Sequence, residues 1–172
     1  MQIQNSTPSD FKRIFELYDA AVEFQKTVFN KQWQGFEASL VNQEIAENRQ
    51  WKIIVDGEIA CIFAITLNDF SIWKEKDKND SIFIHRIVTN PTFRGTNFVQ
   101  HIAVWAKEYA ISIGRTYVRM DTWGDNEKLI GYYQKCGFEF LGVITPDCDG
   151  LPKHYEGITL SLFEIKASLN PS

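Results

Sequence analysis

The sequence predicts an α/β fold in which helices cover a mixed sheet, and two patterns carry this prediction. In the first half, two apolar runs (residues 51–55 and 59–67) flank Asp56-Gly57, a pair of residues typical of a β-hairpin turn. After Ser81, strand patterns alternate with amphipathic helical patterns, an order typical of sheets that contain parallel strands. The chain of 172 residues shows no repeat or linker, so we expect a single domain over 1–172 with a loose tail at 166–172.

Before Ser81 the chain is expected to form two helices, an edge strand and the hairpin. The residues Pro8, Ser9 and Asp10 are typical of a helix N-terminus. The elements in order are an edge strand at 1–6, a helix that buries Phe11, Ile14, Phe15, Tyr18, Val22 and Phe24, a helix at 36–48, the hairpin, and a surface loop at 68–80.

The stretch from Ser81 to Leu141 carries most of the functional information. A strand at 81–89 ends before Pro91, because proline lacks the N–H that a strand ladder needs. A helix begins near Asn97, a good N-cap residue, and Gly114 stands where a helix C-cap is expected. Beyond it we expect a strand at 115–122, a helix at 126–136, a strand at 138–144, a loop at 145–153 and a last strand at 155–164.

Composition excludes several classes of protein. The net charge of −4 argues against a general nucleic-acid binder, and the longest apolar run, at 59–67, is too short to span a bilayer. The N-terminus has no apolar region typical of a signal peptide. Three cysteines without a CxxC pair indicate reduced thiols rather than a disulfide framework or a zinc site. We therefore expect a cytoplasmic protein with no metal, no membrane partner and no nucleic-acid partner.

A strand, a tight turn and a helix N-terminus meet around Arg94-Gly95-Thr96-Asn97. Free N–H groups and the helix dipole converge at such a place and favour an anion. A ligand that carries phosphate is therefore the first hypothesis for this turn.

Three motifs in order resemble the GNAT superfamily of N-acetyltransferases. They are HRIVTNPTFRG, VRMDTWGDN and LIGYYQKCGF, and weaker similarity covers nearly the whole chain. The resemblance implies a mixed, mostly antiparallel sheet with splayed central parallel strands, flanked by helices on both faces. It also implies acetyl-CoA as co-substrate and a primary amine of a small molecule or peptide as acceptor, attacked directly in a ternary complex.

The pyrophosphate loop departs from the family pattern at two positions. The family has Arg or Gln, two residues, Gly, one residue, then Gly or Ala, and this chain has Asn97 and Val99 where the small residues are expected. Asparagine tolerates a left-handed backbone, whereas the branched Val99 side chain is expected to crowd a close ligand.

The resemblance assigns cofactor contacts along this stretch. The backbone amides of Ile87 and Val88 would pair with the pantetheine arm as an added strand, and one of them would polarise the acetyl carbonyl. Asn126 would contact the pantetheine or acceptor side, with helix capping as its alternative role. The other residues expected to bind the cofactor are Arg94, Gly95, Thr96, Asn97, Phe98, Val99 and Tyr133.

Two side chains are candidates for proton transfer. His85 lies in the strand that often carries the base of this family, and amide formation needs a deprotonated amine. Tyr133 falls where the family places the tyrosine that protonates the CoA thiolate. The alternatives are a hydrogen-bonded core histidine and aromatic packing between helix and sheet; Tyr132, one residue away, is expected to face elsewhere.

Aromatic residues near loops are candidates for the acceptor pocket, although plain packing is the alternative. These are Trp33, Phe36, Trp73 and Trp123, with Asp147 and Asp149 as acidic candidates. Arg119 and Asp121 share one face of a strand and are expected to form a structural ion pair.

Two further functions stay open at this point. One is a non-catalytic acyl-CoA-binding or regulatory module on the same fold, and the other is a generic α/β domain without nucleotide. The sequence does not determine the acceptor amine. It also leaves open whether the donor carries an acetyl or a longer acyl group, and whether the protein is a monomer or a homodimer.

Overall fold

The computed structural model describes residues 1–28, 35–147 and 157–168. They form two compact units. Unit 1 comprises Met1–Ile65 and Arg86–Thr96, and unit 2 comprises Thr66–His85 and Asn97–Ser172.

Seven strands are hydrogen-bonded in the order β1-β2-β3-β4-β5-β7-β6. The strands are β1 (Gln2–Asn5), β2 (Gln50–Val55), β3 (Glu58–Thr66), β4 (Ser81–Thr89), β5 (Tyr117–Trp123), β6 (Glu139–Ile144) and β7 (Leu160–Lys166). The helices are α1 (Phe11–Val28), α2 (Ala38–Ala46), α3 (Phe70–Trp73), α4 (Phe98–Ser112) and α5 (Glu127–Lys135), with short 3-10 turns η1 (Pro8–Asp10), η2 (Lys74–Lys76) and η3 (Pro91–Phe93).

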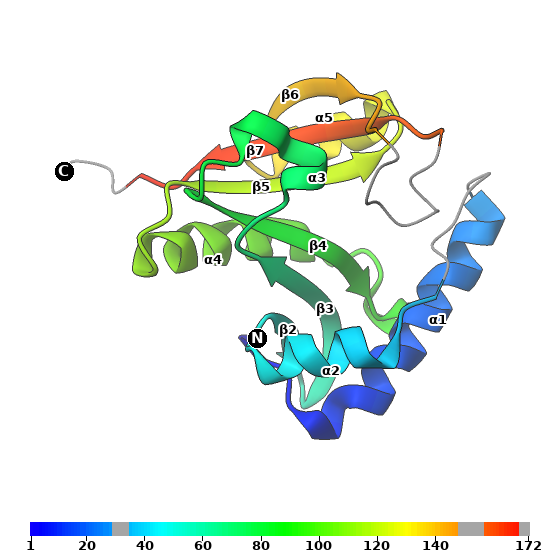
Figure 1. Cartoon of the computed structure of the whole chain (residues 1–172). Coiled ribbons are helices and arrows are strands. Elements are labelled where there is room, and N and C mark those ends of the chain that lie inside the picture. The colour runs from blue at the N-terminus through cyan, green and yellow to red at the C-terminus, as the bar shows by residue number, and fades with distance from the viewer. Residues whose placement is uncertain (29–34, 148–156, 169–172) are drawn as a thin grey trace. The chain divides into compact units, whose positions relative to one another are not determined.

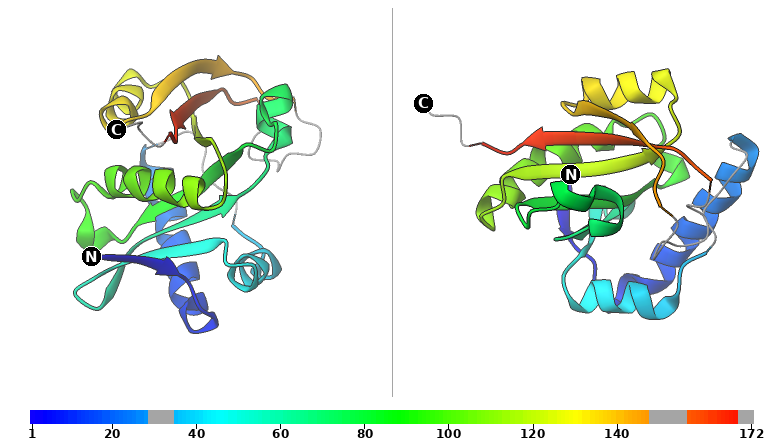
Figure 2. Two further views of the ribbon diagram at one scale, coloured as in Figure 1. Left: turned by 90° about the vertical axis from the view of Figure 1, so that its left-hand side faces the viewer. Right: turned by 45° about the horizontal axis from the view of Figure 1, so that its top comes forward.

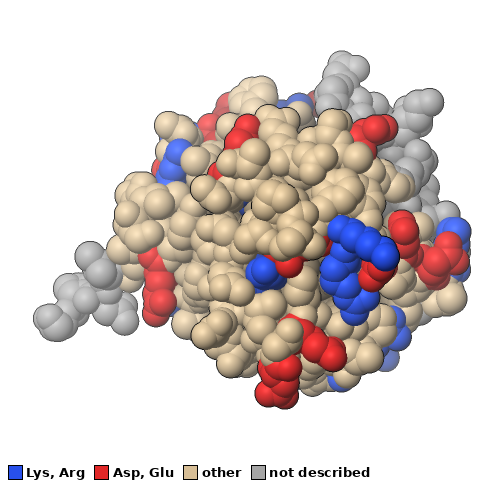
Figure 3. Space-filling model, turned by 90° about the horizontal axis from the view of Figure 1, so that it is seen from below, with Lys and Arg blue, Asp and Glu red and all other residues tan. Residues whose placement is uncertain are grey.

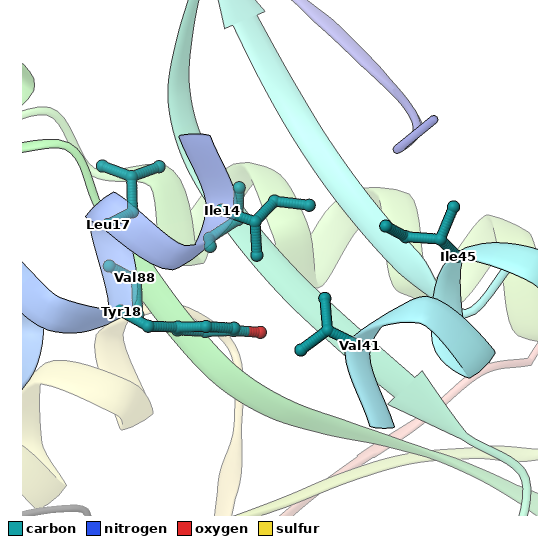
Figure 4. Packing of buried hydrophobic residues seen from close by; sticks show 7 residues of the cluster. Ile14, Leu17, Tyr18, Val41, Ile45 and Val88 are labelled. Atoms are coloured by element: carbon teal, nitrogen blue, oxygen red, sulfur yellow. The ribbon is translucent and has the colours of Figure 1, made fainter. Parts of the chain in front are cut away.

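In unit 1, two helices pack on an antiparallel group of strands. The strands β1, β2 and β3 pair in sequence, and the hairpin turns at Asp56 and Gly57, both with positive φ. Apolar side chains of α1, α2, β3 and β4 form one buried cluster (Figure 4). Its members are Ile14, Leu17, Tyr18, Val41, Ile45, Ile62 and Val88.

Unit 2 contains the one parallel pair among the described strands. The pairs of β4 with β5 run from Ser81–Tyr117 to Ile84–Met120. The strands β5, β7 and β6 then pair antiparallel. Figures 1 and 2 show α4 and α5 on one face of this part of the sheet and α3 on the other. The predicted fold class, a mixed and mostly antiparallel sheet with helices, is thus confirmed.

Most predicted elements are confirmed within a few residues, but the surface loop at 68–80 is not. It contains α3 and η2, because Ile72 and Trp73 bury their side chains against Phe83, Leu160 and the rest of a second apolar cluster. A polar composition concealed this one-turn helix, whose apolar residues are too few to show a period.

The C-terminal strand is shifted toward the C-terminus of the chain. It begins at Leu160 rather than 155 and extends to Lys166, and the Ala167 N–H donates to the Thr116 carbonyl at 2.7 Å. The predicted tail at 166–172 is therefore partly paired; residues 169–172 lie outside the described range. None of the described helices is long and apolar enough to cross a membrane.

Candidate active site

His85 lies on β4 just past the last parallel pair, Ile84–Met120. Its Nε2 is 2.9 Å from the Thr66 hydroxyl, which belongs to the last residue of β3. His85 is half-buried. The side chain is thus held in place and retains some access to solvent or a ligand.

Two carboxyl groups join His85, and the prediction from sequence connected neither of them to it. Donor atoms of Asp69, His85 and Asp121 all lie within 4.8 Å of one another. Asp69 precedes α3, and Asp121 follows Met120, the last residue of β5 that is paired with β4. Nothing in the spacing within either predicted strand indicated that Asp121 lies beside His85, because the pairing of two strands is set between elements.

Both carboxyl groups hold protons more tightly than an exposed aspartate. Burial raises the pKa of Asp69 to about 6, with the Ile72 backbone N–H opposing and the Asp77 charge adding to the rise. Burial and the charge of Asp69 raise the pKa of Asp121 to about 7. The pair therefore titrates as a coupled unit near neutral pH.

The expected ion pair between Arg119 and Asp121 is replaced by other pairs. The Arg119 Nε lies 2.8 Å from the Glu164 carboxylate, and Nη1 lies 3.8 Å from Asp80. Arg119 also lies over the Trp73 ring, at 5.0 Å from its centroid. Because Glu164 is level with Arg119 on the neighbouring strand β7, it reaches the guanidinium more directly.

Tyr133 on α5 belongs to the same electrostatic neighbourhood. Burial raises the pKa of its phenol above the ordinary value, and charges on Tyr132, Cys136 and Asp121 raise it further. The phenol therefore stays protonated at neutral pH and can donate. Its ring packs on Phe163 with centroids 5.0 Å apart, so packing and donation are compatible roles.

The three converging donors also bear on metal binding. An imidazole with two carboxylates is a donor set that a divalent cation accepts. Among the described residues, it is the one group of three or more His, Cys, Asp or Glu side chains whose donor atoms lie close enough to share a metal ion. The expectation of no metal stays a prediction.

The predicted turn and helix N-terminus are present at 94–99. Arg94 is exposed and stacks over Phe24, 4.4 Å from the ring centroid; Phe24 was expected in the core but is 43% exposed. Gly95 has a φ of +90°, a left-handed conformation that favours glycine. Thr96 is exposed, and α4 begins at Phe98.

The Val99 side chain is turned into the core rather than toward a ligand. Val99 is 9% exposed and Phe98 is 1% exposed. The exposed part of this turn therefore consists of residues 94–97. This burial removes the physical reason for expecting Val99 to crowd the ligand.

Asn97 is linked to α5 by its side chain. Its Oδ1 accepts hydrogen bonds from the Tyr132 hydroxyl at 2.7 Å and from the Cys136 thiol at 3.6 Å, and its Nδ2 donates to Gln100 at 3.0 Å. No side-chain cap bond is formed by Asn97 itself. Tyr132 thus holds the α4 N-terminus, a role that the sequence did not indicate.

Asn126 caps α5, as its alternative role predicted. Its Oδ1 accepts from the backbone N–H groups of Lys128 at 3.0 Å and Leu129 at 3.2 Å. On β4, Ile87 is half-buried and Val88 is buried in the unit 1 cluster. Their expected contacts with pantetheine stay predictions.

The aromatic candidates for the acceptor pocket differ in their surroundings. Trp73 is 2% exposed and packs on Phe83, so little of its indole is left for a ligand. Phe36 packs on Tyr18, and Trp123 is half-buried beside the apolar cluster of unit 2. Trp33 and Asp149 lie outside the described residues, and Asp147 is 3.7 Å from the Lys74 ammonium.

Arg86 is the residue of β4 with an unusual backbone. Its φ is 51°, in the left-handed region that is uncommon for residues other than glycine. Its buried guanidinium pairs with Glu44 of α2 and lies over the Tyr18 and Phe36 rings. Nothing in the sequence pattern identified this anchor, because Glu44 is 42 residues away.

Comparison with known proteins identifies the family. The model of the acetyltransferase (GNAT) family matches residues 12–138. The chain is 27% identical over 141 residues to YesJ, an uncharacterized N-acetyltransferase of Bacillus subtilis (strain 168), covering 77% of this chain and 78% of YesJ.

Solved structures share the fold. A GNAT-family acetyltransferase from Listeria monocytogenes 4b F2365 superimposes with a TM-score of 0.76 at 20% identity, over 96% of this chain and 94% of that one. The acetyltransferase YncA of Salmonella typhimurium, solved with acetyl-CoA, gives a TM-score of 0.67 at 10% identity, over 99% and 96%. Since the family model covers well over half of the sequence, the chain belongs to the GNAT family of acetyltransferases.

Proposed function

We propose that this acetyltransferase moves the acetyl group of acetyl-CoA to a primary amine by direct attack in a ternary complex. One observation carries the proposal. His85, Asp121 and Tyr133 share one electrostatic neighbourhood within unit 2. Asp121 thus links the two candidates: its donor atom lies within 4.8 Å of that of His85, and its charge contributes to the raised pKa of Tyr133.

The two candidates suit the two proton transfers that amide formation needs. His85 accepts the first proton from the acceptor ammonium, which frees the nitrogen lone pair to attack the acetyl carbon. As the C–N bond forms and the C–S bond breaks, Tyr133 gives its proton to the thiolate, and the second nitrogen proton replaces it. The raised pKa of the phenol keeps that proton available.

The turn before α4 is the proposed place of the pyrophosphate. Exposed Arg94, the left-handed Gly95 and the first N–H groups of α4 provide positive charge and free donors. YncA was solved with acetyl-CoA on the same fold, which supports the same co-substrate here. We extend the proposal to the backbone amides of Ile87 and Val88 as partners of the pantetheine arm.

The acceptor is proposed to be a small-molecule or peptide amine rather than a nucleic acid. On the face drawn in Figure 3, acidic and basic side chains of the described residues lie close to one another rather than in separate areas. Such a mixture does not offer the continuous basic surface that a phosphate backbone favours.

The test combines binding with turnover. Acetyl-CoA and CoA at millimolar concentration should raise the melting temperature by mass action. Release of free CoA thiol should then depend on an added amine, with the acetylated amine detected by mass spectrometry. A shift in melting temperature with no thiol release for any amine would favour the non-catalytic acyl-CoA-binding module. No shift at all would contradict every proposal that involves CoA.

A further inference from the structure

We infer that the acceptor is a cationic alkylamine whose ammonium group is held by the Asp69 and Asp121 carboxylates beside His85. This inference rests on the proposed acetyl transfer to an amine and names the class of that amine. It concerns recognition of the acceptor and does not change the roles of His85 and Tyr133.

The first support is convergence from three separate elements. Asp69 lies at the start of α3, His85 on β4 and Asp121 on β5, and their donor atoms lie within 4.8 Å of one another. An ammonium has three N–H donors, and two carboxylates with one imidazole offer it three acceptors. The geometry therefore matches the group that must lose a proton before acetyl transfer.

The second support is a carboxylate oxygen without a partner. Asp69 Oδ2 is buried and has no hydrogen-bond partner among the residues that the structure describes. A buried acceptor left without a donor costs free energy, so its position needs an explanation. A donor supplied by a ligand would satisfy it.

The third support is a contrast with the other enclosed acids of the chain. Asp10 pairs with Lys52, Glu44 with Arg86 and Glu164 with Arg119. Asp69 and Asp121 form no ion pair with a lysine or arginine of the described chain. Within the described residues, the other buried acids are thus each paired with a lysine or arginine, and these two are not.

The titration of the two carboxyl groups agrees with a site that binds a cation. Burial raises both pKa values, to about 6 for Asp69 and about 7 for Asp121, and Asp77 adds negative charge near Asp69. A bound ammonium would lower both pKa values, because an opposite charge nearby favours the ionised form. Two further titratable groups face Asp121: the His85 imidazole, and the Tyr133 phenol, which its raised pKa keeps neutral near pH 7.

The inference places the acceptor nitrogen next to its base. An ammonium held by Asp69 and Asp121 has His85 within reach, so its proton passes to the imidazole and the neutral amine attacks. No oxidant, reductant or further co-reactant is needed, and the proton leaves His85 to solvent after the acetylated amine dissociates.

The test compares two classes of amine at one neutral pH. Alkylamines and diamines, which are protonated there, are set against aromatic amines of similar size, which are neutral. The variants are Asp121→Asn and Asp69→Asn. The control is Asp125→Asn, which removes the same charge from an exposed aspartate two residues after the end of β5. Folding of each variant is checked by the shift in melting temperature that acetyl-CoA produces.

We expect the wild type to prefer the alkylamines. Asp121→Asn should lower kcat/KM for them on the order of 10- to 100-fold, the range for a lost charge-assisted hydrogen bond. For aromatic amines, kcat/KM should change less than about twofold, which is within the range of surface charge effects. Asp69→Asn should show the same difference between the two classes of amine. Asp125→Asn should resemble the wild type.

Three results would overturn the inference while leaving acetyl transfer intact. One is a wild type that prefers neutral aromatic amines, and another is an equal loss for both classes in Asp121→Asn. The third is activity that EDTA abolishes and Mn²⁺ or Zn²⁺ restores, since a metal ion would then be the cation. Absence of thiol release for every amine would instead contradict the proposed function itself.

Discussion

His85 is held by Thr66 at the end of the parallel pairing, and replacing it with glutamine keeps a polar side chain but removes the proton acceptor. We expect His85→Gln to lower kcat on the order of 10²–10⁴-fold, the usual contribution of a general base. The KM for acetyl-CoA should change little, because the base acts on the amine.

The matched control for this variant is His101→Gln. His101 is an exposed histidine on α4. The variant His101→Gln should have the same kcat, and the same dependence of kcat on pH, as the wild type. If His85→Gln keeps a wild-type rate and pH profile, His85 is a packing residue.

Tyr133→Phe removes one hydroxyl and keeps the ring that packs on Phe163 and Phe138. We expect kcat to fall on the order of 10²–10⁴-fold if the phenol protonates the thiolate. Because the pKa of the phenol is raised, the effect of its loss on kcat should be measured at neutral pH, and not as a change in the basic limb of the pH–rate profile. Single-turnover acetyl transfer isolates the chemical step, and a wild-type rate there would exclude this role.

At the scale of elements, the hydrogen bond from Tyr132 to Asn97 joins α5 to the N-terminus of α4. Tyr132→Phe should weaken acetyl-CoA binding by about 2- to 13-fold, which corresponds to a hydrogen bond of about 0.5–1.5 kcal/mol. The value of kcat should stay near wild type. Tyr132→Phe thus contrasts with Tyr133→Phe, because it should change the affinity for acetyl-CoA and not the rate of the chemical step.

The readout is the dissociation constant of acetyl-CoA by calorimetry, beside kcat. Asn97→Ala should weaken binding to a similar degree, and the double variant should add little, since both remove the same bond. Additive effects in the double variant would show that Tyr132 acts elsewhere.

A buried ion pair joins β4 to α2 in unit 1. Glu44 is 2% exposed and holds Arg86, whose backbone has a positive φ. Glu44→Gln should lower the free energy of unfolding by about 3–5 kcal/mol, because it leaves a buried guanidinium without its counter-charge. Urea unfolding measures this change.

The exposed pair of α1 provides the control. Glu23 and Lys26 are 2.7 Å apart, with side chains 70% and 49% exposed. Glu23→Gln should change stability by less than about 1 kcal/mol. Equal effects of the two substitutions would mean that the Arg86 pair is solvated in solution.

At the scale of the whole molecule, the acidic cluster lowers stability as pH rises. The pKa of Asp121 is about 7 in the folded protein against 3.8 ordinarily, so the folded state keeps its proton longer. The contribution of Asp121 to the free energy of unfolding is therefore fully present below about pH 3.8, and it is lost as the pH rises through about 7.

Asp121→Asn removes the carboxyl group that ionises, so the variant does not lose this stability as the pH rises. The variant should be more stable than the wild type at pH 8, by an amount on the order of 1–3 kcal/mol, and nearly equal to it at pH 4. Urea midpoints measured across this range provide the comparison, with Asp125→Asn expected to show no such trend. A constant difference at all pH values would mean that Asp121 is not titrating between the folded and unfolded states. A gain in stability with a loss of turnover is typical of active-site carboxylates.

The sequence by itself determined the motifs and most of the elements. Turn residues such as Asp56-Gly57, the strand that ends before Pro91 and the helix beginning after Asn97 are local signals, and each is found where it was predicted. The GNAT motifs are likewise short stretches of neighbouring residues, and they indicated His85, Tyr133 and the loop at 94–99.

Only the tertiary structure decided which distant side chains meet. Asp69 before α3, His85 on β4 and Asp121 on β5 come together in space, and Asn97 meets Tyr132, which lies 35 residues away in the chain. The exchange of Asp121 for Glu164 as the partner of Arg119 has the same origin. Contacts of this kind depend on register and packing between elements, which the spacing of residues within each element does not encode.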